Sequence, residues 1–188
     1  PYAVFTFDPD GRYENNQDHR RVAQAVDEAF WVACFDKHYP EHFQEGLQPF
    51  SVCERWYFAR QLPKITHVEE ITATIEQKIK ALCAHREMMR NTINQSRLQL
   101  QTWGKCIPWL DQSINGDLQP PFGTFLQEQA KMVAVEAGWD PETRLGEAFR
   151  LERFGDMELL FQRMSESLPG TQEVPSRPEL EKASDIES

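Results

Sequence analysis

An apolar run opens the chain, a polar loop follows it, and a helical pattern comes next. Residues 2–7 predict a buried strand, and Asp8-Pro9-Asp10-Gly11 has the residue types of a turn. Apolar residues then recur at helical spacing over residues 20–36, which predicts an amphipathic helix with Asp18 as its N-terminal cap. In α/β proteins the loops that follow strands carry the chemistry. The polar loop is therefore the first place to look for a functional site.

Short aromatic segments and longer helical stripes alternate along the rest of the chain. Residues 51–59 are rich in aromatic side chains and predict a second strand, and residues 65–68 predict a short extended piece. Helices are expected at residues 71–103, 122–138 and 154–164, with a proline-rich connector at residues 107–121. Residues 38–49 predict a loop, because Pro40 and Gly46 interrupt any regular helix there.

Composition narrows the class of protein. A length of 188 residues predicts one domain, and 40% hydrophobic with 27% charged residues is typical of globular proteins. The formal charge of −10 disfavours nucleic acid and anionic membranes as partners, since both need a basic face, and no apolar run is long enough to span a membrane. The four cysteines form no Cys-x-x-Cys pair, which predicts reduced thiols in a cytoplasmic protein.

Three segments resemble one known family, the PIG-L/LmbE-like zinc-dependent N-deacetylases. The first contains Thr6-Phe7-Asp8-Pro9, Gly11, Tyr13 and Asp18-His19-Arg20-Arg21-Val22, with Asn16 and Gln17 where the family has His and Pro. The second is Glu70-Ile71-Thr72 followed by Lys78-Ile79-Lys80-Ala81-Leu82-Cys83-Ala84-His85-Arg86. The third is Glu147-Ala148-Phe149-Arg150, which resembles a turn that faces the substrate pocket in many family members.

The resemblance implies an α/β fold, with a Rossmann-like, mostly parallel sheet flanked by helices. Residues 1–164 would be the C-terminal part of the deacetylase domain, with the later strands only, and residues 165–188 an acidic, disordered tail. The family's Ala-His-Pro-Asp-Asp-Glu segment, which supplies two zinc ligands and the catalytic carboxylate, has no counterpart in the 188 residues. We therefore expect a fragment of a longer protein, inactive by itself.

The implied function is zinc-dependent hydrolysis of an N-acetyl group on an N-acetylglucosamine-type or related amide substrate. His19 would hold Zn²⁺ in a site that is incomplete in this chain. Tyr13 and Asn16 would stabilise the oxyanion, and Asp18 would orient a neighbour, although its family partner is replaced by Asn16. From spacing alone, Asp18 and His19 also fit a helix cap with a surface histidine, and Asn16 equally fits an ordinary polar loop.

Other charged and histidine residues carry weaker signals. Glu147 and Arg150 are expected to bind substrate, although such a pair is commonly a surface ion pair. His85 falls on the apolar stripe of its predicted helix, three residues after Leu82, and is interpreted as a core or interface histidine.

Two further functions are compatible with the sequence. The chain could be a non-catalytic member or fragment of the family that acts as a binding module. It could also be a helix-rich interaction protein that shares the motifs by accident.

Overall fold

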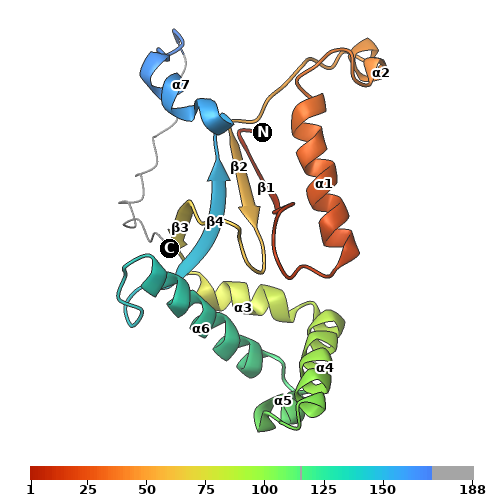
Figure 1. Ribbon diagram of the computed structural model, residues 1–188, viewed down its shortest axis with the longest axis vertical. Helices are drawn as coiled ribbons and strands as arrows, with labels where there is room; N and C mark the ends of the chain where they lie inside the picture. The colour runs from red at the N-terminus through yellow and green to blue at the C-terminus, as the bar shows by residue number, and fades with distance from the viewer. Residues whose placement is uncertain (115, 171–188) are drawn as a thin grey trace. The chain divides into compact units, whose positions relative to one another are not determined.

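The computed structural model of the protein describes residues 1–114 and 116–170 (Figure 1). The expected tail at residues 165–188 lies mostly outside this part of the chain, so its character stays a prediction. The described chain forms two compact units, one made of residues 1–67 and 148 onward, the other of residues 68–147. The elements are, in order, β1 (Ala3–Phe7), α1 (Gln17–Val32), α2 (Pro40–Gln44), β2 (Glu54–Phe58), β3 (His67–Glu70), α3 (Ile75–Cys83), α4 (Arg86–Thr102), α5 (Pro108–Ser113), α6 (Gln119–Glu136), β4 (Gly146–Glu152), a 3-10 turn (Gly155–Met157) and α7 (Glu158–Met164).

The strands form a sheet in the order β1-β2-β4-β3. β1 and β2 are parallel, with Phe5 opposite Trp56, and α1 and α2 make the crossover that a parallel pair requires. β2 and β4 are antiparallel. β3 and β4 are antiparallel too, because backbone hydrogen bonds join Thr66 to Phe149 and Ile71 to Leu145.

The expected α/β fold class is confirmed, but the sheet in the described residues is mixed and not mostly parallel. The antiparallel direction of β4 relative to β3 follows from the position at which β4 begins. The amide of Ile71, just after β3, donates to the carbonyl of Leu145, just before β4. This bond places the start of β4 beside the end of β3, so β4 must run back along β3 in the opposite direction.

In the first unit, α1 covers one face of the β1–β2 pair (Figure 1). Alternation along β2 sends Arg55 and Tyr57 to this face. The Arg55 guanidinium lies 4.5 Å from the centre of the Phe30 ring, and the Tyr57 hydroxyl donates a 3.2 Å hydrogen bond to Asp27. Trp56 points to the other face, where it stacks on Phe5 at a centroid distance of 5.1 Å.

Helices of the second unit pack around two apolar clusters. The first joins α3 to α6 and contains Ile71, Ile75, Ile79, Leu126 and Ala130. The second joins α4, α5 and α6 and contains Met89, Ile93, Leu110, Leu118 and Phe122. The expected long helix is divided at Ala84 and His85, since α3 ends at Cys83 and α4 begins at Arg86. This break lets α3 and α4 direct their stripes into different clusters. It also leaves His85 exposed, which contradicts the core alternative expected for it, whereas the interface alternative stays a prediction.

Prolines begin two short helices that the sequence pattern did not predict. Pro40 and Pro108 open α2 and α5, where the missing backbone N–H costs no hydrogen bond. The segment around Glu147 also differs from expectation, because it is the strand β4 and not a turn.

Gly146 should be intolerant of a side chain. A Cβ there would lie 2.9 Å from Val68 Cγ1 and 3.0 Å from Val133 Cγ1. We expect Gly146→Ala to lower the free energy of unfolding by about 1–3 kcal/mol, measured by urea denaturation. Gly123→Ala is the matched control, because a Cβ there meets only Ile79 at 3.7 Å and alanine favours the interior of α6. Equal destabilisation by both substitutions would contradict this account of the packing.

Tyr57 should make stability depend on pH in the alkaline range. Burial, together with the charges of Asp27 and Glu152, raises the pKa of Tyr57 from 10.0 to about 12. A phenol whose folded pKa is raised contributes its stability fully below pH 10 and loses it as the pH rises towards 12. The difference in unfolding free energy between the parent and Tyr57→Phe should therefore shift in favour of Tyr57→Phe across this window. A difference that stays constant from pH 9 to pH 12 would argue against a neutral Tyr57 in the folded state.

Candidate functional site

A tight turn at Asp8 begins the candidate site directly after β1. The Asp8 side chain accepts a 2.8 Å hydrogen bond from the amide of Asp10, and its carbonyl accepts one from Gly11 at 3.1 Å. These bonds confirm the predicted turn. A Cβ on Gly11 would lie 2.7 Å from the Cβ of Ala59, so the loop approaches the end of β2 more closely than any other residue type permits.

Asp8 is buried and forms a bidentate ion pair with Arg150 of β4. Arg150 Nε donates to Asp8 Oδ2 at 2.6 Å and Nη2 donates to Oδ1 at 3.0 Å. The guanidinium also pairs with Glu152 and lies 4.2 Å from the centre of the Tyr57 ring. Burial by itself would lower the pKa of Arg150, but the hydrogen bonds and charge of Asp8, with the charge of Glu152, raise it overall. The positively charged guanidinium of Arg150 is therefore held in a fixed position beside the Asp8 turn.

His19 lies in the first turn of α1, with its ring held on two sides. The Nδ1 atom is 3.0 Å from Oε2 of Glu14, and the imidazole stacks on Phe7 with ring centroids 4.1 Å apart and planes 14° from parallel. Its side chain remains 33% exposed. The ring can thus present Nε2 outward while Nδ1 is occupied.

Glu14 is the residue that the sequence interpretation missed. Its side chain is 11% exposed, Oε1 accepts a 2.8 Å bond from the amide of Asn16, and Oε2 lies 3.6 Å from Nε of Arg60. Burial would raise the pKa of Glu14, but the bonds from His19 and Asn16 and the charges of His19 and Arg60 lower it overall. The only signal in the sequence was an acidic residue five positions before a histidine, at no recognised spacing.

Asn16, not Asp18, caps α1. The Asn16 backbone is extended and its side-chain oxygen accepts a 2.9 Å bond from the amide of Asp18. Asp18 itself is exposed in the first helical turn, where the helix dipole favours a negative charge. The cap was assigned two residues too late because Asp and Asn are equally good caps, and only the backbone path shows where the helix begins.

Tyr13 stands at the tip of the loop. Its side chain is 73% exposed and its backbone φ is 63°, in the left-handed region that few non-glycine residues occupy. A bridge between Arg12 and Gln61, with a 3.0 Å bond from the Arg12 amide to the Gln61 carbonyl, fixes the preceding residue. Tyr13, Asn16, Asp18 and His19 therefore belong to one braced loop and helix start.

Glu147 and Arg150 do not pair with each other. They lie three residues apart on β4, so their side chains leave opposite faces of the strand. Glu147 forms a 2.6 Å ion pair with Lys78 in the second unit, whereas Arg150 belongs to the first. The expected role of the two residues in substrate binding stays a prediction.

Metal-ligating residues do not gather into a cluster of three or more His, Cys, Asp or Glu anywhere in residues 1–114 or 116–170. His19 belongs to no such group in this part of the chain, and its expected role as a zinc ligand stays a prediction. Each of the four cysteines is a free thiol. Across the described segments, no helix combines the length and apolar character needed to cross a membrane.

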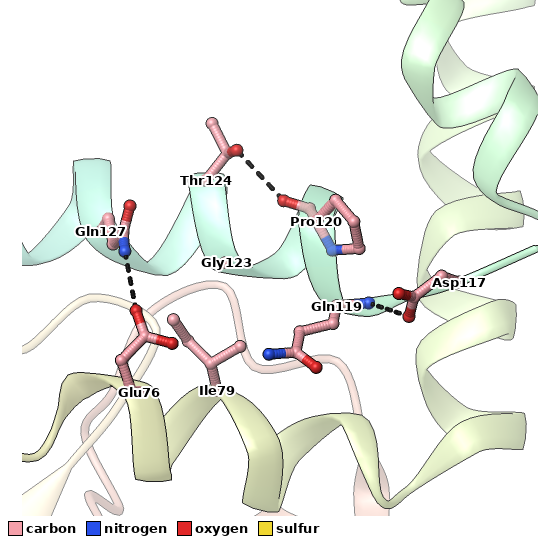
Figure 2. Close-up of a pocket in the computed structure, with 8 residues that line it drawn as sticks. All are labelled: Glu76, Ile79, Asp117, Gln119, Pro120, Gly123, Thr124 and Gln127. Carbon is pink, nitrogen blue, oxygen red and sulfur yellow. Dashed lines mark hydrogen bonds between the residues drawn. The ribbon is translucent and has the colours of Figure 1, made fainter.

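A separate hollow of about 520 Å³ lies in the second unit, between α3 and α6 (Figure 2). Figure 2 shows Glu76 accepting a hydrogen bond from Gln127 and Asp117 accepting one from the amide of Gln119. Both carboxylates are therefore engaged in local bonds. The hollow contains none of the site residues expected from the sequence.

One solved structure supports the fold. The chain is similar to N,N'-diacetylchitobiose deacetylase from Pyrococcus horikoshii, solved in complex with its inhibitor MPG, with a TM-score of 0.55 and 22% identity. This similarity confirms the α/β fold. It covers 88% of this chain and 49% of the other, so the chain spans about half the length of that enzyme. No protein-family model matches the sequence, and no curated protein does.

The Asp8–Arg150 pair should be essential for the loop. Removing one charge of a buried pair typically costs about 3–5 kcal/mol, and the lower end of this range applies here because Glu152 remains as a second partner of Arg150. We expect Asp8→Asn to lower the unfolding free energy by about this amount in urea denaturation. Asp10→Asn is the matched control, since Asp10 lies two residues away in the same turn and is exposed. If both variants were equally stable, the ion pair would not be the anchor of the turn.

Proposed function

We propose that the full-length protein is a metal-dependent N-deacetylase and that this chain contributes one side of its active site. The observation that carries the proposal is the histidine at the start of α1, whose Nδ1 is bonded to a carboxylate while Nε2 is directed away from it. Histidine ligands of zinc commonly donate the N–H of their other ring nitrogen to a carboxylate in this way. The fold similarity to a deacetylase and the sequence resemblance to PIG-L/LmbE-like enzymes support the same reaction class.

The substrate we propose is an N-acetylated sugar or a related amide. In such a site bound Zn²⁺ would polarise the amide carbonyl and activate a water molecule. His19 would supply one ligand through Nε2, and further ligands and the general base would have to come from elsewhere in the full-length protein. Tyr13, exposed at the loop tip, would donate a hydrogen bond to the carbonyl oxygen. We place the protein in the cytoplasm, where its free cysteines would stay reduced.

One role expected from the sequence is weakened by the geometry. The side-chain oxygen of Asn16 is committed to the helix cap. Its amide N–H₂ group remains the only part that could act as an oxyanion donor, and that use stays a proposal.

A non-catalytic binding role is the second candidate. It is favoured by the observation that the described residues bring together no group of three metal ligands. Zinc content of the full-length protein separates the two candidates, because a binding module without metal would purify free of zinc.

His19→Ala in the full-length protein should lose zinc and activity together. We expect zinc per protein, measured by elemental analysis, and acetate release from an N-acetylglucosamine oligomer to fall to background. His85→Ala is the control, because His85 is exposed at the break between α3 and α4. Full zinc content in His19→Ala would remove His19 from the metal site.

A further inference from the structure

We propose that Glu14 is a positioning residue that fixes the tautomer and orientation of His19. Glu14 makes the Nδ1 atom of the imidazole the one that carries hydrogen, and thereby leaves the lone pair of Nε2 free at the surface of the loop. The role of Nε2 as a metal ligand rests on the proposed function. The tautomer does not depend on any metal.

The chemistry of the two partners determines the direction of the hydrogen bond. An ionised carboxylate only accepts hydrogen bonds, whereas a neutral imidazole has one donor and one acceptor nitrogen. Because Glu14 Oε2 lies 3.0 Å from Nδ1, Nδ1 must be the donor. The acceptor lone pair of the neutral ring is then on Nε2, on the side away from the carboxylate.

The carboxylate of Glu14 is also held by a contact that does not involve His19. Its other oxygen, Oε1, accepts the amide of Asn16, the residue that caps α1. The cap fixes the start of the helix, and with it the position from which the His19 side chain leaves the backbone. A single glutamate therefore connects the loop, the helix cap and the imidazole.

Phe7 supplies the second restraint on the ring. The stack at 4.1 Å and 14° sets the plane of the imidazole, whereas the bond from Glu14 selects one of the two ring orientations that are related by a 180° flip about the Cβ–Cγ bond. Both are needed, because a stacked ring can still flip in this way and exchange the positions of Nδ1 and Cδ2. Arg60 is a weaker candidate for this work, since it touches Glu14 only at 3.6 Å and its side chain is 60% exposed.

The substitution Glu14→Gln tests the proposal sharply. Glutamine has one acceptor oxygen for two donors, the Asn16 amide and Nδ1–H. If its oxygen keeps the Asn16 amide, its N–H₂ group faces His19 and donates to Nδ1, which moves the ring proton to Nε2. Glu14→Ala is the second variant, because it removes both acceptors without introducing a donor.

The first measurement is ¹⁵N NMR of the histidine rings in the 188-residue chain, at a pH well above the ordinary histidine pKa of about 6.5. Comparison with His19→Ala identifies the His19 signals. We expect the Nδ1–H form in the parent and in Arg60→Gln, and the Nε2–H form to become dominant in Glu14→Gln and Glu14→Ala, with circular dichroism confirming that each variant is folded. An Nε2–H ring in the parent, or an unchanged tautomer in both folded Glu14 variants, overturns the proposal.

The second measurement is zinc affinity of the full-length protein, determined by competition with a chelator. Loss of such a supporting partner typically weakens metal binding about 10–100-fold, so we expect this loss in Glu14→Gln and no comparable loss in Arg60→Gln. Equal affinities of the parent and Glu14→Gln would overturn the link to the metal. If the full-length parent bound no zinc while its isolated chain kept the Nδ1–H ring, the proposed function would fail and the positioning of His19 by Glu14 would stand.

Discussion

The buried carboxylate of Asp8 constrains the segment between β1 and α1, and the candidate site is built on that constraint. A carboxylate without solvent needs a cation and hydrogen bonds, and Arg150 and the Asp10 amide supply them. The pair joins residues 142 positions apart, so it ties β4 to the turn that follows β1. Because the two bonds are bidentate, they fix direction as well as distance.

A second carboxylate, that of Glu14, organises the rest of the loop and is slightly more exposed than the carboxylate of Asp8. Glu14 bonds the helix cap and the imidazole at once, while Gly11 and the Arg12–Gln61 bridge hold the loop against the end of β2. The two acids therefore have different roles: Asp8 fixes the loop to the sheet, and Glu14 fixes His19 to the loop. Such support would suit the metal-ligand role proposed for His19, since a binding site works best when supporting residues hold its ligands in position.

The sequence pattern alone determined the strand–turn–helix order around residues 2–36 and the second strand. These features depend on local periodicity and turn residues, which act over a few positions. The α/β class and the proposed role of His19 came from the resemblance to a known family, and the role of His19 stays a prediction. The division of the predicted long helix at His85 was not, because the apolar stripe continues across the break and only the two separate clusters show that its halves face different neighbours.

Only the tertiary structure decided which side chains pair with one another. The sequence pattern could suggest that Arg150 pairs with Glu147, but an odd separation on a strand turns the two side chains to opposite faces, and the sheet brings Arg150 to Asp8 instead. Likewise, Asp18 and Asn16 both have the chemistry of a helix cap, and only the backbone path assigns the cap to Asn16 and leaves Glu14 beside His19. Residue type fixes what a side chain can bind, whereas the path of the chain fixes which partner lies within 3 Å.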